Sequence, residues 1–320
     1  MKFKVLATDK VSAEGLAVLH EDDRFEVAYI DQSSSDKFLE ALSSVDALVV
    51  RSATNVGADL IDNAQRLKMV GRAGVGIDNV DVEAASARGI AVYNAPGGNT
   101  NAATEMTMAL MLSLLRKIPA AERSLRDGQW DRSAFKGNEL RGRTLGLIGA
   151  GRIGGEVAKR CQAFGMSCIV YDPYLTETRA DELCVRLVDL GDVLDDADVI
   201  SIHVPLTEET RDLVDAEALS RMKNGALVIN ASRGGVIDEL ALADALTAGE
   251  IGGAALDVYE YEPLAEDSPL RDAPNLILTP HLGGSTAEAQ VEVAREIAGH
   301  IVRCLADSDA TGALNAFQIN

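Results

Sequence analysis

Residues 145–154 read Leu-Gly-Leu-Ile-Gly-Ala-Gly-Arg-Ile-Gly, and the fold predicted for the whole chain starts from this stretch. Its apolar beginning is typical of a buried parallel strand. Gly149, Gly151 and Gly154 follow in the spacing G-x-G-x-x-G, and apolar residues then recur at helical spacing over 156–164. A strand, a glycine turn and a helix in this order indicate a unit that binds the phosphates of a nucleotide at the helix N-terminus.

An acidic residue completes the pattern. A second strand is predicted over Ser167–Tyr171, and it ends in Asp172, in the position from which a carboxylate can bind both ribose hydroxyls of NAD and repel the 2′-phosphate of NADP. A glycine turn by itself is also found in α/β domains where it is purely structural. The strand, the helix and the acid together favour NAD binding by this segment.

The composition restricts the class of protein. The chain has 320 residues, enough for two domains with cores of their own, and its net charge of −20 argues against nucleic acid or an anionic membrane surface as a partner. The four cysteines, Cys161, Cys168, Cys184 and Cys304, show no metal-binding spacing, so we expect reduced, buried residues in a cytoplasmic protein and no metal. The first ten residues do not resemble a signal peptide, and Met106–Leu115 is too short to span a bilayer.

Strand and helix signals alternate on both sides of the central segment. Before residue 97 they predict another doubly wound parallel sheet, without a glycine motif after its first strand. A turn-rich cluster at 94–101 predicts a domain boundary, and a long helix is expected at about 102–116, with Pro119 kinking or breaking it. Thr210–Leu219 is also predicted to be helical.

Ligands of open parallel sheets bind beyond the carboxyl ends of the strands. The polar residues predicted at those ends are Arg51, Ser52, Arg72, Asp172, His203, Arg233, Asp257 and His281, and Glu262 follows in the loop after Asp257.

Hydride transfer between NAD and an alcohol or ketone requires a proton at the oxygen, and histidine is suited to exchange it near neutral pH. His20 and His300 fall in or beside amphipathic helices and are expected at the surface, whereas His203 and His281 end strands. The Leu-Gly-Gly turn after His281 favours an open ring there, and Glu262 is the best candidate for a carboxylate that orients it.

Arginines are the candidates for an anionic substrate. Arg233 precedes two glycines that allow close approach, and its planar two-donor head matches a carboxylate. Arg51, Arg72 and Arg132, the last from a partner subunit, could hold a second anion. Alternatively, Arg51 and Arg72 bind backbone groups or ion pairs.

Several longer motifs resemble the D-2-hydroxyacid dehydrogenase family, and within it most closely the members that act on 3-phosphoglycerate. They are the glycine stretch, Asn-Ala-Ser-Arg-Gly-Gly-Val-Ile-Asp-Glu (230–239), Ala-Leu-Asp-Val-Tyr-Glu-Tyr-Glu-Pro (255–263), Thr-Pro-His-Leu-Gly-Gly (279–284), Gly-Arg-Ala-Gly-Val-Gly-Ile-Asp-Asn-Val-Asp (71–81), Asn-Ala-Pro-Gly-Gly-Asn (94–99) and Asp-Gly-Gln-Trp-Asp-Arg (127–132).

The resemblance implies an α/β fold of two doubly wound parallel-sheet domains. A Rossmann NAD-binding domain, 98–286, is inserted in a flavodoxin-like substrate domain formed by 1–97 and 287–320. A homodimer through the long helix near 102–126 is also implied. Because the sequence ends at Asn320, regulatory domains beyond it, and feedback by serine through them, are not expected.

The resemblance also implies roles for individual residues. The catalytic residues would be Arg233, Glu262 and His281. The cofactor-binding residues would be Gly149, Gly151, Arg152, Ile153, Gly154, Asp172, His203, Val204, Pro205, Ala231, Ser232, Asp257, Gly283 and Gly284. The substrate-binding residues would be Arg51, Ser52, Arg72, Arg132, and Val75 and Gly76 at the cleft between the domains.

The expected activity is therefore NAD-dependent oxidation of 3-phosphoglycerate to 3-phosphohydroxypyruvate, an entry to serine biosynthesis. A dehydrogenase of another 2-hydroxy acid, such as 3-sulfolactate, or a reductase of hydroxypyruvate or glyoxylate, is the alternative. A non-catalytic NAD-sensing protein is a third reading, and the complete set of Arg233, Glu262 and His281 argues against it.

Overall fold

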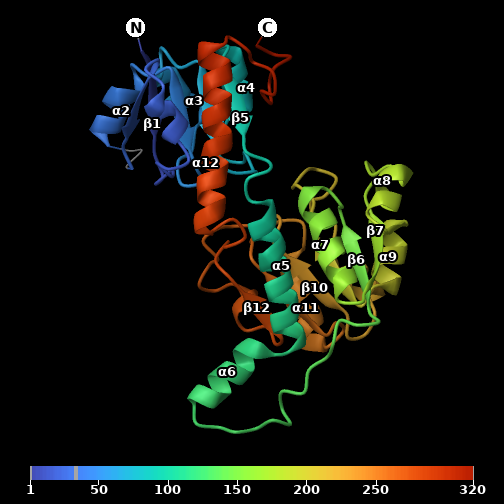
Figure 1. Cartoon of the computed structure of the whole chain (residues 1–320). Coiled ribbons are helices and arrows are strands. Elements are labelled where there is room, and N and C mark those ends of the chain that lie inside the picture. Colours follow the sequence, from blue (N-terminus) through green and yellow to red (C-terminus); the bar gives the residue numbers. More distant parts are fainter. Residues whose placement is uncertain (1, 32–34, 320) are drawn as a thin grey trace. The chain divides into compact units, whose positions relative to one another are not determined.

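The computed structural model describes residues 2–31 and 35–319, and the chain divides into two compact units (Figure 1). Unit 1 comprises Met1–Asn99 and Gly284–Asn320, and unit 2 comprises Thr100–Gly283. Each unit contains one sheet, and every strand pair in both sheets is parallel. The predicted α/β class with two parallel sheets is confirmed.

Unit 1 has the strand order β2-β1-β3-β4-β5, which is the flavodoxin-like order. Helix α12 packs against β4 and β5, although it lies about 200 residues further along the chain. The elements are β1 (Phe3–Ala7), α1 (Ala17–Glu21), β2 (Phe25–Tyr29), α2 (Asp36–Leu42), β3 (Ala47–Val50), α3 (Ala58–Asn63), β4 (Met69–Arg72), α4 (Val82–Ala87), β5 (Ala91–Asn94), α12 (Ala287–Ile301) and a π-helical turn (Val302–Ala306).

Unit 2 has the order β12-β11-β10-β9-β6-β7-β8: the chain starts at β6, adds β7 and β8 on one side, and then crosses back to add β9 to β12 on the other side, as in a Rossmann sheet. The elements are α5 (Thr100–Leu115), α6 (Ile118–Arg126), β6 (Thr144–Ile148), α7 (Arg152–Ala163), β7 (Ser167–Tyr171), α8 (Glu177–Glu182), β8 (Arg186–Leu187), α9 (Leu190–Asp196), β9 (Val199–Ile202), α10 (Ala216–Arg221), β10 (Leu227–Asn230), α11 (Glu239–Ala248), β11 (Gly253–Leu256), a 3₁₀ turn (Pro269–Arg271) and β12 (Leu276–Leu278).

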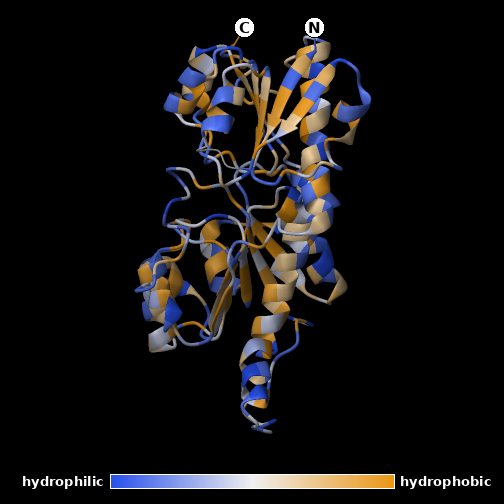
Figure 2. Cartoon of the chain, turned by 90° about the vertical axis from the view of Figure 1, so that its left-hand side faces the viewer, coloured by the Kyte–Doolittle hydropathy of each residue, from blue (hydrophilic) through white to orange (hydrophobic). Residues whose placement is uncertain are grey.

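The central strands are apolar because helices cover both faces of each sheet. Strands β3, β9, β10 and β11 are buried along their whole length. Figure 2 shows hydrophobic strands inside helices of mixed character. Continuous apolar strands of this kind are characteristic of parallel sheets, so the polar residues that follow them stand out as candidates for function.

The predicted helix over Thr210–Leu219 is wrong in its first half. Val214 instead forms a parallel bridge with Ile237, and α10 begins only at Ala216. Asp215 sets this start because its side chain accepts a hydrogen bond from the Ala218 N–H, as an N-cap residue does.

The expected break of the long helix near Pro119 is confirmed: α5 ends at Leu115, Lys117 has a left-handed backbone, and Pro119 lies in the first turn of α6, where no backbone N–H is needed. Two further expectations need correction. The short elements α8, β8 and α9 carry no strong periodic pattern and were not expected. Cys161 and Cys168 are buried as predicted, but Cys184 is exposed and Cys304 is only partly buried.

None of the helices formed by residues 2–31 and 35–319 combines the length and the apolar character needed to cross a membrane.

Candidate active site

The glycine turn after β6 has the geometry that a bound dinucleotide requires. Gly149 has a φ of +90°, and a Cβ there would lie 2.7 Å from the His203 carbonyl oxygen. A Cβ on Gly154 would lie 2.3 Å from the Gly149 carbonyl oxygen, so α7 packs against the turn only with glycine at this position. A Cβ on Gly151 would meet no atom within 4 Å. The turn is therefore closed towards the protein at Gly149 and Gly154 and open at Gly151.

Asp172 lies beside this turn at the end of β7. Its carboxylate accepts one hydrogen bond from the Ala150 N–H and another from the Tyr174 N–H, each 2.9 Å long. Arg152 and Ile153 form the first turn of the twelve-residue helix α7, where backbone N–H groups are unpaired within the helix. An acid and a helix N-terminus on the two sides of an open glycine fit the ribose and pyrophosphate of NAD.

His203 has a different environment from a catalytic acid. One ring nitrogen is 2.8 Å from the hydroxyl of the buried Ser201. Although part of the residue reaches the surface, burial of the ring lowers the pKa of His203 to about 4, so it is neutral at pH 7. Val204 and His203 both lie against Gly149, so His203 belongs to the frame of the glycine turn.

Arg233, Glu262 and His281 follow three neighbouring strands. Strand β10 pairs with β11, and β11 pairs with β12, so the loops after their carboxyl ends lie on the same edge of the sheet. The Nδ1 atom of His281 is 2.8 Å from a carboxylate oxygen of Glu262. The side chains remain 47% and 38% exposed, so the pair is open to a small molecule.

The charges around Glu262 keep it ionised. Burial by itself would raise the pKa of the Glu262 carboxyl, but the hydrogen bond and positive charge of His281, the Tyr259 N–H and the charge of Arg233 lower it below its ordinary value of 4.5. The carboxylate is therefore charged at neutral pH and holds the Nδ1 side of the imidazole.

The backbone around Arg233 is shaped by its neighbours. The buried Asn230 donates a hydrogen bond to the Arg233 carbonyl and accepts from the Ser232 N–H and hydroxyl. A Cβ on Gly234 would lie 1.8 Å from the Tyr259 carbonyl oxygen, so only glycine lets the loop after β10 pack on the loop after β11. Arg233 itself donates from Nη1 to the Ser232 carbonyl oxygen over 2.7 Å.

Asp257 holds the segment that carries His281. Its fully buried carboxylate accepts hydrogen bonds from the Thr279 hydroxyl (2.6 Å), the Leu282 N–H (2.8 Å) and the Gly283 N–H (2.7 Å). The Tyr259 hydroxyl donates to the Thr279 carbonyl oxygen over 2.9 Å. His281 thereby keeps a left-handed backbone with φ of +53°, which is uncommon for a residue other than glycine.

Sequence reasoning missed Asn230, Tyr259 and Thr279, which fix the loops of the catalytic candidates. A buried asparagine at the end of an apolar strand was a usable signal for Asn230. A cavity of about 540 Å³ lies against the His281 and Glu262 pair. Its lining consists of Tyr259, Glu262, Pro263, Leu264, Arg271, Leu278, Thr279, Pro280 and His281.

The remaining cofactor candidates also follow strands of unit 2, with one exception. Pro205 follows β9 and Ala231 and Ser232 follow β10. Gly283 is the last residue of unit 2, whereas Gly284 is assigned to unit 1.

Most substrate candidates lie in unit 1. Arg51 follows β3, and Arg72 ends the neighbouring strand β4 in register with Val50. Ser52 is exposed in the loop after β3, and Val75 and Gly76 are partly buried in the loop after β4. The structure therefore brings the two arginines to adjacent strand ends, as expected.

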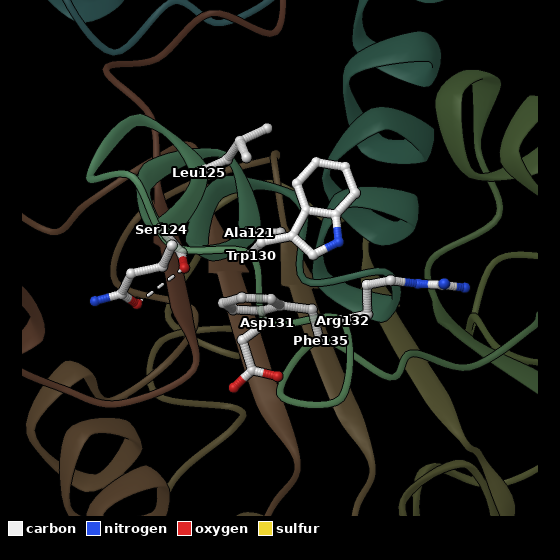
Figure 3. Close-up of a pocket in the computed structure, with 8 residues that line it drawn as sticks. Ala121, Ser124, Leu125, Trp130, Asp131, Arg132 and Phe135 are labelled. Atoms are coloured by element: carbon white, nitrogen blue, oxygen red, sulfur yellow. Dashed lines mark hydrogen bonds between the residues drawn. The ribbon is translucent and has the colours of Figure 1, made fainter.

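Arg132 belongs to unit 2, where it follows α6. It lines a hollow of about 330 Å³ together with Ala121, Ser124, Leu125, Gln129, Trp130, Asp131 and Phe135. Figure 3 shows the Arg132 side chain extending away from the Trp130 indole.

Throughout the described part of the chain, no three or more His, Cys, Asp or Glu side chains gather in a way that could hold a metal ion.

Comparison with known proteins agrees with this geometry. The sequence profile of the D-isomer specific 2-hydroxyacid dehydrogenase NAD binding domain matches residues 108–283. Among solved structures, the TT0316 protein of Thermus thermophilus superposes with a TM-score of 0.88 at 34% identity, covering 98% of this chain and 100% of that one.

Two curated relatives are more similar in sequence. The D-3-phosphoglycerate dehydrogenase of Archaeoglobus fulgidus is 46% identical over 98% of this chain and 59% of its own length. That of Mycobacterium tuberculosis is 48% identical over 97% of this chain and 58% of its own length. The chain thus spans less than three fifths of these relatives.

Proposed function

Because the chain belongs to the D-isomer specific 2-hydroxyacid dehydrogenase family, we propose that it transfers a hydride between NAD and a small 2-hydroxy acid. The observation that carries this proposal is the 2.8 Å hydrogen bond between His281 and Glu262 on a strand edge shared with Arg233. A sensor protein that only binds NAD would need the glycine turn but not this open acid–base pair.

The chemistry assigns one task to each of the three residues. NAD, when bound, supplies the hydride acceptor or donor. Arg233 binds the substrate carboxylate through its planar two-donor head. His281 uses Nε2, because Nδ1 faces Glu262: it donates a proton to the carbonyl oxygen in ketone reduction and accepts one from the hydroxyl in alcohol oxidation. Glu262 orients the ring and stabilises its protonated form.

The cofactor assignment uses the turn after β6. We assign the pyrophosphate to the backbone N–H groups of Arg152 and Ile153 and the adenosine ribose to Asp172. The other cofactor assignments are Gly149, Gly151, Gly154, His203, Val204, Pro205, Ala231, Ser232, Asp257, Gly283 and Gly284.

For the substrate we propose 3-phosphoglycerate, oxidised to 3-phosphohydroxypyruvate. Arg51 and Arg72 at adjacent strand ends support a second anionic group, since the chain as a whole carries a charge of −20. The names of the two curated relatives also support it. Ser52, Val75, Gly76 and Arg132 complete the proposed substrate-binding residues.

The test is NADH-dependent reduction of 3-phosphohydroxypyruvate, 3-sulfopyruvate, hydroxypyruvate, glyoxylate and pyruvate, compared as kcat/KM. We expect 3-phosphohydroxypyruvate to be preferred at least tenfold over hydroxypyruvate, because the latter lacks the second anion. A preference for 3-sulfopyruvate would keep the two-anion site but change the substrate. If none of these keto acids is reduced although NADH still binds, the protein binds the cofactor without catalysing the reaction.

We also infer a homodimer formed through α5 and α6. None of the nine residues of α6 is buried. Ile118 and Leu125 on this helix are 51% and 57% exposed, and Trp130 in the following loop is 80% exposed. An apolar surface of this kind on one segment is typical of a surface that a partner covers.

A further inference from the structure

The loop Arg51–Thr54 in unit 1 is held by two side chains that come from other loops. The first is Asp9, which follows β1. One of its carboxylate oxygens accepts hydrogen bonds from the Arg51 N–H (2.9 Å) and the Thr54 N–H (3.0 Å). The other oxygen accepts from the Thr54 hydroxyl over 2.6 Å. Asp9 therefore binds the two ends of the loop at once.

The second side chain is Asn79, in the loop between β4 and α4. Its amide nitrogen donates to the Arg51 carbonyl (2.7 Å) and to the Thr54 carbonyl (2.6 Å). Thus the N–H and the C=O of both Arg51 and Thr54 are bonded to side chains from elsewhere in the sequence. Ser52 and Ala53 between them stay exposed. The result is a fixed loop with an accessible tip.

The backbone at Asp9 is in an uncommon conformation. Asp9 and the following Lys10 have φ values of +57° and +55°, in the left-handed region that residues other than glycine uncommonly adopt. Thr54, which donates two of these hydrogen bonds and accepts a third, is 1% exposed. Strain that persists at an otherwise ordinary loop points to a functional demand on the shape of that loop.

We propose that Asp9 and Asn79 are positioning residues that preorganise the loop Arg51–Thr54 to bind the second anionic group of the substrate. This inference rests on the proposed function, because it takes the phosphate of 3-phosphohydroxypyruvate as the ligand of the loop. We call the hydrogen bonds from Asp9 and Asn79 to this loop the clamp. Because a loop that is already ordered does not have to be ordered on binding, the clamp increases the affinity for the substrate without touching the reacting atoms.

Two variants at position 9 distinguish the effect of the hydrogen bonds from the effect of the negative charge. In Asp9→Asn the amide oxygen can accept from both N–H groups while the amide nitrogen donates to the Thr54 hydroxyl, so the clamp is retained. In Asp9→Ala the three donors lose their acceptor. A Thr54→Val variant removes only the 2.6 Å hydrogen bond in a side chain of nearly the same shape, and it serves if Asp9→Ala does not fold.

The experiment compares kcat and KM for 3-phosphohydroxypyruvate and for hydroxypyruvate in the wild type and these variants. We expect Asp9→Ala to raise the KM for 3-phosphohydroxypyruvate about tenfold or more, with kcat and the KM for hydroxypyruvate changed less than about threefold. Asp9→Asn should stay within about threefold of the wild type for both substrates, and Thr54→Val should shift the KM in the same direction as Asp9→Ala by a smaller factor. The Kd for NADH should not change.

Each alternative outcome has a distinct meaning. If the wild type prefers the phosphorylated substrate and Asp9→Ala keeps that preference, the positioning role is overturned while the proposed function stands. If Asp9→Ala raises the KM for both substrates by the same factor, Asp9 is merely structural and the inference is again overturned. If the wild type shows no preference, the substrate assignment fails and the ligand proposed for the loop fails with it.

Discussion

The two strand-end histidines of unit 2 differ in their surroundings, and that difference supports the roles that we propose for them. His281 is half exposed and bonded to an ionised carboxylate, so it can exchange protons with a substrate. His203 is bonded to the buried Ser201 hydroxyl and packed against the glycine turn, and burial keeps it neutral. Both are histidines that follow a strand, and their environments support the proposal that His281 exchanges the proton while His203 belongs to the cofactor turn.

His203 gives a prediction for stability against pH. Burial lowers its pKa from 6.5 to about 4, so as pH falls from 6.5 to 4 the unfolded chain takes up a proton that the folded chain does not. The folded state therefore loses stability over this window, by about 2 kcal/mol at pH 5 from this residue. A His203→Gln variant should show a smaller drop in Tm between pH 7 and pH 5 than the wild type.

His20→Gln is the matched control, because His20 is exposed and its ring lies 2.9 Å from the Tyr29 hydroxyl. Its Tm should fall with pH as in the wild type. An identical fall in His203→Gln would mean that the buried ring takes up its proton as readily as an exposed one.

At the scale of elements, the turn between β6 and α7 contains glycines that are needed for two different reasons. Gly154 is required by packing, since a Cβ would meet the Gly149 carbonyl oxygen at 2.3 Å. Gly151 faces open space, and the protein itself does not require glycine there. We attribute the need for glycine at position 151 to the ligand, because a bound pyrophosphate would approach the backbone closely there.

A pair of alanine variants tests this distinction. Gly151→Ala should weaken NADH binding about tenfold or more and leave the Tm unchanged within error, because the added methyl group meets only the ligand. Gly154→Ala should lower the Tm as well, because α7 must shift. Binding is measured by NADH fluorescence titration and Tm by calorimetry. If Gly151→Ala bound NADH like the wild type, the pyrophosphate would lie elsewhere.

Elements with a strong pattern could be predicted from the sequence, and those decided by long-range contacts could not. The apolar strand β6, the glycine turn and α7 are local patterns, and they appear where expected. Residues 210–215 have helical composition, but Val214 pairs with Ile237 across the fold, and this contact overrides the local preference.

The candidate site follows the same rule. Arg233, Glu262 and His281 could be selected because strand ends gather at one edge. The hydrogen bonds of Asp9 and Asn79 depend on which loops meet, since Asp9 and Arg51 are 42 residues apart and Asn79 and Arg51 are 28 apart. A local sequence pattern does not show which residues far apart in the chain will be in contact.

At the scale of the whole molecule, the two sheets contribute different functions to the proposed reaction. Unit 2 contains the dinucleotide turn and the three proposed catalytic residues, whereas unit 1 contains the fixed loop proposed to bind an anion. The exposed apolar residues of α6 belong to neither task. We propose that a second copy of the chain covers them.

The oligomeric state checks this explanation. A Leu125→Glu variant places a charge on the exposed α6 surface, and we expect it to sediment as a monomer where the wild type sediments as a dimer. Leu39→Glu is a suitable control, because Leu39 is also exposed (43%) but lies in unit 1. A wild type that sediments as a monomer at micromolar concentration would contradict the homodimer.

The most direct test of the central claim is a single-turnover measurement of hydride transfer with His281→Ala. Enzyme loaded with NADH is mixed with 3-phosphohydroxypyruvate, and the loss of NADH absorbance is followed. The account predicts a rate about 10²- to 10⁴-fold below that of the wild type, with the Kd for NADH changed less than about threefold, because His281 supplies the proton and does not hold the cofactor. An unchanged rate would contradict the account and remove His281 from the reaction.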